Sequence, residues 1–136
     1  MFCIGELLEE RKANITNKVL ERQLTLGLAG LSPENLENVV IAYEPVWAIG
    51  ASGTPASAEY AQEKHEFIKN TLVELFGEQG EEITVLYGGS VNPQNAKELI
   101  QKPNIDGLFI GRSAWDAKAF NDLIREVLNI VKEATC

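Results

Sequence analysis

Hydrophobic residues gather in four short runs along the chain, and each run predicts a buried β-strand. The runs are continuous rather than alternating, and they are rich in β-branched and aromatic residues. This pattern is typical of parallel strands that are covered on both faces. The four predicted strands span residues 2–4, 39–43, 83–87 and 107–110.

Between and after these runs, hydrophobic residues recur at spacings of three and four, which indicates amphipathic helices. The longer predicted helices span residues 15–30, 57–76 and about 114–134. A shorter helix is predicted after Asn92-Pro93, with Asn92 as its N-cap and Pro93 at its first position. A strand followed by a helix therefore occurs four times, which predicts an α/β fold with a parallel sheet and right-handed crossovers.

The length and charge of the chain narrow its class. Its 136 residues suit one domain with a moderate core, and no low-complexity linker divides them. The formal net charge of −8 disfavours nucleic acid as a partner, because phosphate backbones attract basic surfaces. An acidic total still allows a small phosphorylated substrate, since such a ligand responds to its local pocket.

No run approaches the roughly 20 apolar residues of a membrane span, and no leader pattern begins at Met1, so we expect no membrane insertion. Cys3 and Cys136 stand at opposite ends of the chain without the spacing of a metal site. We interpret both as packing or bystander thiols and expect no metal. The cytoplasm is the expected compartment.

Unusual residues follow each predicted strand. In parallel α/β folds, functional sites gather where the strands end in their carboxyl direction, because the loops converge there. Glycines at such places let a backbone approach a ligand, and their amides can bind an anion. They are also common in plain turns, and that alternative stays open for each loop alone. The segments concerned are Gly5-Glu6, Glu44-Pro45, Gly88-Gly89-Ser90 and Gly111-Arg112-Ser113.

Glu44 ends an apolar strand and is followed by an apolar segment, residues 45–54. A carboxylate in that position is a candidate general base, although a surface carboxylate at a loop start is the simpler alternative. Pro45-Val46-Trp47 is stiff, the tip at residues 50–53 is made of small residues, and Thr54-Pro55 closes the segment. We interpret residues 45–54, called the lid below, as a gate that closes over a substrate.

Two aromatic residues have simpler interpretations. His65 lies four residues after Ala61 and three before Ile68, so it falls on the inward stripe of the predicted helix at 57–76. A structural histidine is the expected role there. Trp115, just after the last strand loop, is expected to be a packing residue.

The segments CIGE, AYEPVWAIG, YGGSV and DGLFIGRSAW together resemble the C-terminal half of the triosephosphate isomerase family, which has the TIM-barrel fold. The resemblance runs over essentially the whole chain. It implies that residues 1–136 form one partial domain, the C-terminal half of a (β/α)8 barrel. About four parallel βα units would be present and the N-terminal half absent, so the barrel would be incomplete.

The resemblance also implies an activity in glycolysis and gluconeogenesis. Glu44 would be the base that moves a proton between adjacent carbons of a triose phosphate through an enediol. Pro45, Val46 and Trp47 would form the N-terminal hinge of the lid, and Glu6 would be the partner of the Trp47 indole. This isomerisation requires no organic cofactor or metal.

The same resemblance implies a phosphate site and a second lid contact. Gly50 and Ser90 would offer backbone amides to the phosphate, and Gly111 with Arg112 would complete the cradle. Tyr87 would be a lid partner through its hydroxyl. The family commonly has an alanine amide at the position we assign to Pro55, which has no N–H, so we expect Tyr87 to need another partner.

Two further departures from the family pattern matter. The catalytic lysine and the electrophilic histidine belong to the missing half, so we expect the isolated chain to lack full activity unless a complementary chain completes it. Arg112 replaces a glycine, and its side chain either pairs with phosphate or reshapes the pocket. An isomerase of a four-carbon ketose phosphate, such as an erythrulose phosphate, is therefore the alternative. A non-catalytic half-barrel is another, and the full-length protein is expected to be a homodimer.

Overall fold

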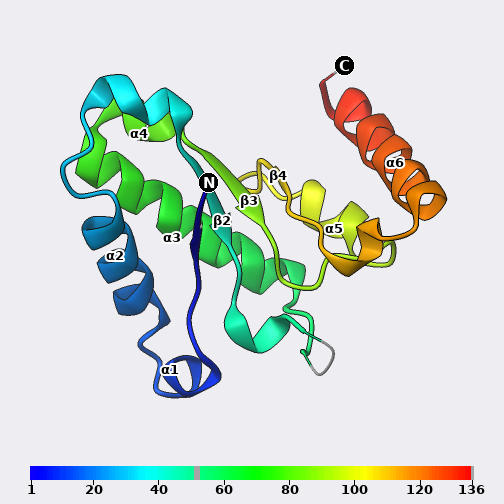
Figure 1. The fold of residues 1–136 in the computed structure, drawn as a ribbon, viewed down its shortest axis with the longest axis horizontal. Helices are drawn as coiled ribbons and strands as arrows, with labels where there is room; N and C mark the ends of the chain where they lie inside the picture. The colour runs from blue at the N-terminus through cyan, green and yellow to red at the C-terminus, as the bar shows by residue number, and fades with distance from the viewer. Residues whose placement is uncertain (51–52, 136) are drawn as a thin grey trace.

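The computed structural model describes residues 1–50 and 53–135 (Figure 1). Its centre is one parallel sheet with the strand order β1-β2-β3-β4. All four predicted strands are present, and the last three are shorter than predicted. Ala51 and Ser52, at the tip of the predicted lid, lie outside the described residues, as does Cys136. The strands are β1 (Phe2–Ile4), β2 (Val40–Tyr43), β3 (Thr84–Tyr87) and β4 (Gly107–Leu108).

Helices connect the strands, as the sequence predicts. The short helix before β4 begins at Ala96, later than the expected start after Asn92-Pro93. Asn92 instead caps the preceding turn, because its Oδ1 accepts from the N–H groups of Gln94 and Asn95 at 2.9 and 3.2 Å. The helices are α1 (Leu8–Lys12), α2 (Thr16–Gly27), η1 (Pro33–Asn38), η2 (Val46–Ala48), α3 (Ala58–Phe76), α4 (Glu78–Glu81), α5 (Ala96–Ile100), η3 (Arg112–Ala114) and α6 (Ala117–Thr135).

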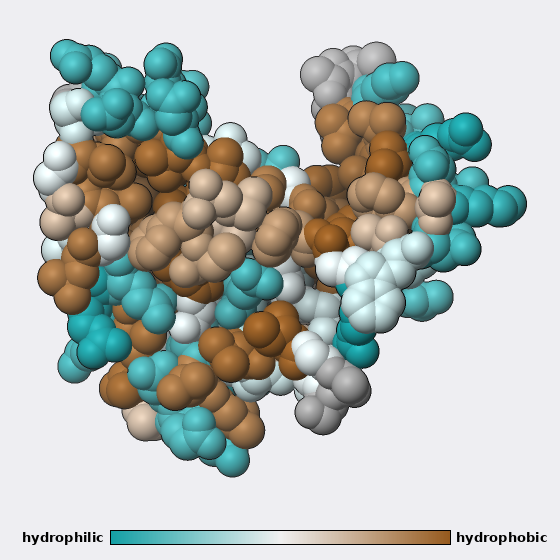
Figure 2. Space-filling model, in the orientation of Figure 1, coloured by the Kyte–Doolittle hydropathy of each residue, from teal (hydrophilic) through white to brown (hydrophobic). Residues whose placement is uncertain are grey.

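The helices cover one face of the sheet, where the core lies. Tyr43 of β2 and Tyr87 of β3 are fully buried there, against α3. On the other face Cys3 is exposed and Leu86 is only half-buried. Figure 2 shows hydrophobic residues extending across the viewed face, where the strands run in Figure 1. Cover on both faces, which the continuous apolar pattern predicts, is therefore found on one face only.

The last helix, α6, packs against α5 and η3 and stands apart from α2 and α3 (Figure 1). Leu123 is buried, but Ile124 and Leu128 remain exposed along the same helix. Trp115, in the turn before α6, is 82% exposed. The expectation that Trp115 is a packing residue is therefore wrong for this structure.

The carboxyl ends of the strands lie at one edge of the sheet, and the ladder continues into the loops. The N–H of Glu44 donates to the carbonyl of Ile4 at 2.7 Å, and the N–H of Gly88 donates to the carbonyl of Tyr43 at 2.9 Å. The first residues after β2 and β3 therefore continue the hydrogen-bond ladder of the sheet. The loops that carry the candidate residues consequently start side by side.

Candidate active site

Two glycines leave room for Glu44 at the end of β2. A Cβ on Gly5 would lie 1.9 Å from the carbonyl oxygen of Glu44, and a Cβ on Gly88 would lie 2.7 Å from its Cγ. Gly5 is itself fixed by Gln23 of α2, whose Oε1 accepts from the Gly5 N–H at 2.9 Å and whose Nε2 donates to the Gly5 carbonyl at 3.1 Å. The backbone of the loops after β1 and β3 therefore packs closely against the backbone and Cγ of Glu44.

Cys3 lies beside Glu44 on the open face of the sheet. Cys3 pairs with Ala42 in the β1–β2 register, and Glu44 is two residues further on the same face. Partial burial, followed by hydrogen bonding to Glu44 and the charge of its carboxylate, raises the pKa of the Cys3 thiol. The sequence interpretation of Cys3 as a bystander missed this contact, although the strand register could have indicated it.

Glu44 faces a pocket of about 530 Å³ at the carboxyl edge of the sheet. The residues that the resemblance assigns to substrate binding, from three separate loops, all reach this pocket. Ile49, Val91 and Phe109 are the large apolar residues that line this pocket. The lining residues are Glu44, Ile49, Gly50, Gly88, Ser90, Val91, Asn92, Phe109, Gly111, Arg112 and Ser113.

The loop after β3 is held in a strained conformation at Ser90, which has a φ of 55°. The Ser90 N–H donates to the Gly88 carbonyl at 3.2 Å, and its hydroxyl donates to the carbonyl of Ala48 in the lid. The Nδ2 groups of Asn92 and Asn95 donate to the Ser90 carbonyl at 3.3 and 3.1 Å. The Ser90 side chain therefore fastens the lid, while its amide is turned toward its own loop.

The loop after β4 also contacts the lid. The Nη2 of Arg112 donates to the carbonyl of Gly50 at 2.7 Å across the pocket, and both residues are exposed. The hydroxyl of Ser113 donates to the Val91 carbonyl at 2.9 Å, which joins the β4 loop to the β3 loop. A Cβ on Gly111 would meet no atom within 4 Å, so this part of the wall is open.

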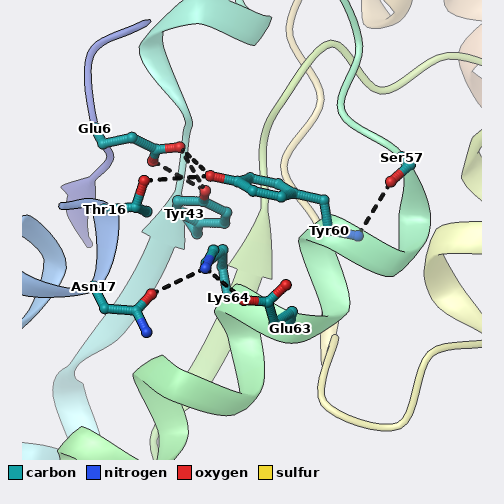
Figure 3. A network of polar contacts seen from close by, with 8 residues as sticks. All are labelled: Glu6, Thr16, Asn17, Tyr43, Ser57, Tyr60, Glu63 and Lys64. Carbon is teal, nitrogen blue, oxygen red and sulfur yellow. Dashed lines mark hydrogen bonds and ion pairs between the residues drawn. The ribbon is translucent and has the colours of Figure 1, made fainter. Parts of the chain in front are cut away.

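Glu6 is the centre of a buried network below the lid (Figure 3). The Trp47 Nε1 donates to the Glu6 carboxylate at 2.8 Å, which is the contact expected from the resemblance. The hydroxyl of Tyr60 donates to it at 2.7 Å, and that of Tyr43 donates to its second oxygen at 3.0 Å. Burial, with the Glu6 charge, raises the pKa of Tyr43, and burial raises the pKa of Tyr60 to about 12.

Arg11 completes this network from α1, the short helix after β1. Its guanidinium lies 3.8 Å from the centre of the Trp47 ring and 4.6 Å from the centre of the Tyr60 ring. Cation–π contacts of this kind hold aromatic faces in a fixed orientation. Sequence reasoning missed both Tyr60 and Arg11. The only available signal was an aromatic residue near the start of the helix that follows the lid.

His65 has the inward position that the helical spacing predicts, and it is fully buried. Its Nδ1 lies 3.1 Å from the carbonyl oxygen of Asn104, while its Nε2 has no hydrogen-bond partner among the described residues. Burial lowers the pKa of His65 to about 4. A neutral, structural histidine is consistent with this environment.

Tyr87 meets the far end of the lid, but at a different residue from the one expected. Burial raises the pKa of the Tyr87 hydroxyl. The Ala56 backbone faces this hydroxyl and lowers its pKa in part. The assignment of Pro55 to this position is therefore wrong, since the facing residue is Ala56, which has an N–H. The geometry does not complete a hydrogen bond, and the Tyr87 hydroxyl has no partner in the described part of the chain.

The described residues hold no cluster of three or more His, Cys, Asp or Glu side chains arranged to bind a metal ion. Within the same residues, none of the helices combines the length and apolar character required to cross a bilayer.

Comparison with known proteins gives the family. The family model described as triosephosphate isomerase matches residues 1–127. The chain belongs to the triosephosphate isomerase family. The four parallel βα units and the matched length agree with the predicted partial TIM barrel, because the chain spans about half the length of the curated relatives it matches.

Relatives in this family have two different names. A triosephosphate isomerase from Carboxydothermus hydrogenoformans is 48% identical over 92% of this chain and 50% of its own length. An L-erythrulose-1-phosphate isomerase from Rhizobium etli is 48% identical over 93% of this chain and 47% of its own length. A second L-erythrulose-1-phosphate isomerase, from Rhizobium meliloti, is 46% identical over 96% of this chain and 51% of its own length.

Proposed function

We propose that this chain supplies one half of an aldose–ketose isomerase acting on a short sugar phosphate. The specific reaction we propose is that of a triose-phosphate isomerase, which interconverts dihydroxyacetone phosphate and glyceraldehyde 3-phosphate. One observation carries the proposal: a single pocket gathers the carboxylate of Glu44 with the loop ends at Gly50, Ser90 and Gly111. Family membership supports the same reaction class.

Glu44 is the base in this proposal. Its carboxylate takes a proton from the carbon beside the substrate carbonyl, which leaves an enediol, and then returns a proton to the neighbouring carbon. The reaction moves protons between positions of one molecule, so it gains and loses no electrons and needs no redox cofactor. The groups that serve the substrate oxygens belong to the upstream half of the barrel, as the resemblance implies.

The phosphate is proposed to lie between the lid and the two glycine loops. Gly111 and Arg112 open the short helix η3, so their N–H groups have no partner inside that helix. The Gly50 amide would approach from the lid. Ser90 would first have to turn its N–H away from Gly88, so substrate binding is expected to reshape the β3 loop.

A four-carbon ketose phosphate is the second candidate, and Arg112 favours it. Its side chain occupies space beside the pocket and places a positive charge there. A phosphate held by that guanidinium would lie further from Glu44 than one held by the backbone alone, and a longer carbon chain would then bridge the two. The names of the two Rhizobium relatives point to the same substrate class.

Several properties of the whole protein are proposals on the same basis. Residues 1–136 would form one partial domain, the full-length protein would be a cytoplasmic homodimer, and the isolated chain would be inactive without its complementary half. A non-catalytic half-barrel remains the alternative to an enzyme.

The test uses a completed barrel, in which the N-terminal half of the Carboxydothermus hydrogenoformans relative precedes this chain. We expect turnover of glyceraldehyde 3-phosphate, with a loss of about a thousandfold in kcat for Glu44→Asp, because the shortened side chain moves the base. A thermal midpoint close to that of the parent serves as the folding control. Equal activity of the two proteins would remove Glu44 from the mechanism, and a folded but inactive parent would favour the non-catalytic alternative.

Substrate choice is tested with Arg112→Gly in the same completed barrel. If Arg112 selects the longer substrate, the ratio of kcat/KM for erythrulose phosphate over triose phosphate should fall by about tenfold, the scale of one charge-assisted hydrogen bond. Arg112→Lys keeps the charge and is the matched control. An unchanged ratio in both variants would exclude Arg112 as the source of substrate preference.

A further inference from the structure

Tyr60 and Trp47 donate to the same oxygen of a buried carboxylate from opposite ends of the lid. The Trp47 Nε1 lies 2.8 Å from the Oε1 of Glu6, and the Tyr60 hydroxyl lies 2.7 Å from that same atom. Trp47 belongs to the first turn of the lid, whereas Tyr60 follows its last residue by six positions. The shorter contact of Tyr43 is with the other oxygen, at 3.0 Å, while its distance to Oε1 is 3.3 Å.

Glu6 makes this arrangement consequential because it is fully buried. A carboxylate that water cannot reach depends on hydrogen-bond donors from the protein. Removing one such donor costs more stability than a hydrogen bond on the protein surface contributes. Within residues 1–50 and 53–135, Glu6 takes part in no ion pair. Any movement that takes the Trp47 indole away from Glu6 therefore has to leave Oε1 with another donor.

Tyr60 is well suited to be that donor because it is fixed to a rigid element. Ser57 caps α3 and its Oγ accepts from the Tyr60 N–H at 3.2 Å, as Figure 3 shows. The Tyr60 hydroxyl also lies 3.5 Å from the Oγ of Thr16 in α2. Its ring meets the Trp47 ring edge-on with centroids 5.6 Å apart. Two of these contacts, with Ser57 and Thr16, come from residues outside the lid.

We propose that Tyr60 is a positioning residue of the lid: it keeps Glu6 hydrogen-bonded when Trp47 swings away on substrate binding. This inference rests on the proposed function, since it assigns a role to the proposed lid. Without the Tyr60 hydroxyl, release of Trp47 would leave Oε1 with only the 3.3 Å contact of Tyr43. Trp47 would then be held more tightly, and the lid would resist the change that a bound phosphate requires.

The experiment follows Trp47 directly in the completed barrel, with every other tryptophan changed to phenylalanine. Inorganic phosphate is titrated while Trp47 fluorescence is recorded. Tyr60→Phe removes only the hydroxyl, and we expect the phosphate concentration at half-change to rise about tenfold. Tyr43→Phe is the matched control, because it removes a hydroxyl from the same carboxylate within the sheet. It should lower thermal stability and leave the phosphate midpoint within about twofold of the parent.

A second measurement tests the proposal independently, in case one variant is poorly folded. Tyr60→Phe and Trp47→Phe are combined, and phosphate affinity is measured by calorimetry for the parent, both single variants and the double variant. Sharing of one oxygen predicts that Tyr60→Phe has almost no effect once the indole is gone. Additive effects would overturn the proposal, as would equal midpoint shifts for Tyr60→Phe and Tyr43→Phe, or a parent whose Trp47 does not respond to phosphate.

The two proposals fail in distinguishable ways. Absence of turnover with both triose and tetrulose phosphates would refute the proposed isomerase activity. The Trp47 signal and the calorimetric cycle use phosphate alone, so they still decide whether Tyr60 positions the lid.

Discussion

Where β2 ends, buried residues alternate with exposed ones: Pro45 and Ala48 are inaccessible, Val46 is exposed, and the nearby Glu6 is fully buried. Where β4 ends, Gly111 and Arg112 are exposed. After the roles proposed for them above, we call these two regions the base side and the anion side. The strands behind them differ in the same sense, because β2 pairs with a strand on each side, whereas β4 contributes two residues and pairs with β3 alone.

This contrast shows which wall of the pocket is held in place by many contacts within the chain. On the base side, hydrogen bonds within the chain surround Glu44 and the lid hinge, and a substitution there should disturb both stability and rate. On the anion side, two contacts between loops, Arg112 to Gly50 and Ser113 to Val91, hold the wall in place. Changes there should alter substrate affinity with little effect on folding.

The largest expected effect on the base side is acid destabilisation through His65. Its pKa is about 4 in the folded chain, below the ordinary value of 6.5, so the unfolded chain binds the proton more readily. The contribution of neutral His65 is therefore complete above pH 6.5 and is lost as the pH falls toward 4. By pH 5 the free energy of unfolding should have fallen by about 2 kcal/mol relative to pH 7.

Urea unfolding of the completed barrel at pH 7, 6 and 5 measures this loss. His65→Asn removes the titrating group, so its free energy of unfolding should depend less on pH over the same range. Equal slopes for the parent and the variant would mean that other groups cause the acid sensitivity. Arg112→Gly, on the anion side, should keep the slope of the parent.

Two glycine substitutions compare the sides directly. Gly88→Ala places a Cβ 2.7 Å from the Cγ of Glu44, so this proposed base has to move, and kcat should fall by about tenfold to a hundredfold. Gly111→Ala meets no atom within 4 Å, so it should change kcat by less than about threefold. Steady-state kinetics in the completed barrel test both variants, and equal losses would contradict the assignment of tight and open walls.

The smallest expected effect concerns the cap of α3. Ser57→Ala removes the side-chain acceptor for the Tyr60 N–H, which should cost about 1 kcal/mol of stability. Ser57→Asp keeps an acceptor and should restore most of this loss. Thermal unfolding of the three proteins measures this effect, and an Ala variant as stable as the parent would show that the Ser57 cap does not stabilise α3.

Much of the fold could be predicted because its signals are local. Apolar runs marked the four strands, and the 3.6-residue period marked α3, which begins and ends within a residue of the expected positions. The residues that follow the strands were predicted to converge, since parallel strands end at one edge. The start of α5 was misplaced because the Asn92 side chain satisfies the preceding turn instead of the helix.

The remaining features depend on contacts that no local pattern specifies. The Arg112 side chain reaches Gly50 across 62 positions, and Tyr60 reaches Glu6 across 54. The resemblance assigned Pro55 to face Tyr87, but the path of the chain after the lid brings Ala56 there instead. Side-chain reach and loop path decide such contacts, and a single sequence records neither.

Gln23 has a consequence for the evolution of this barrel. By bonding both the N–H and the carbonyl of Gly5, it acts as a surrogate for a neighbouring peptide group, and it does so from a helix that takes no part in lining the pocket. A change to glutamate would lose the donor while keeping the size. Drift on α2 is therefore not neutral at this position, and any exchange of α2 between relatives has to carry a matching amide with it.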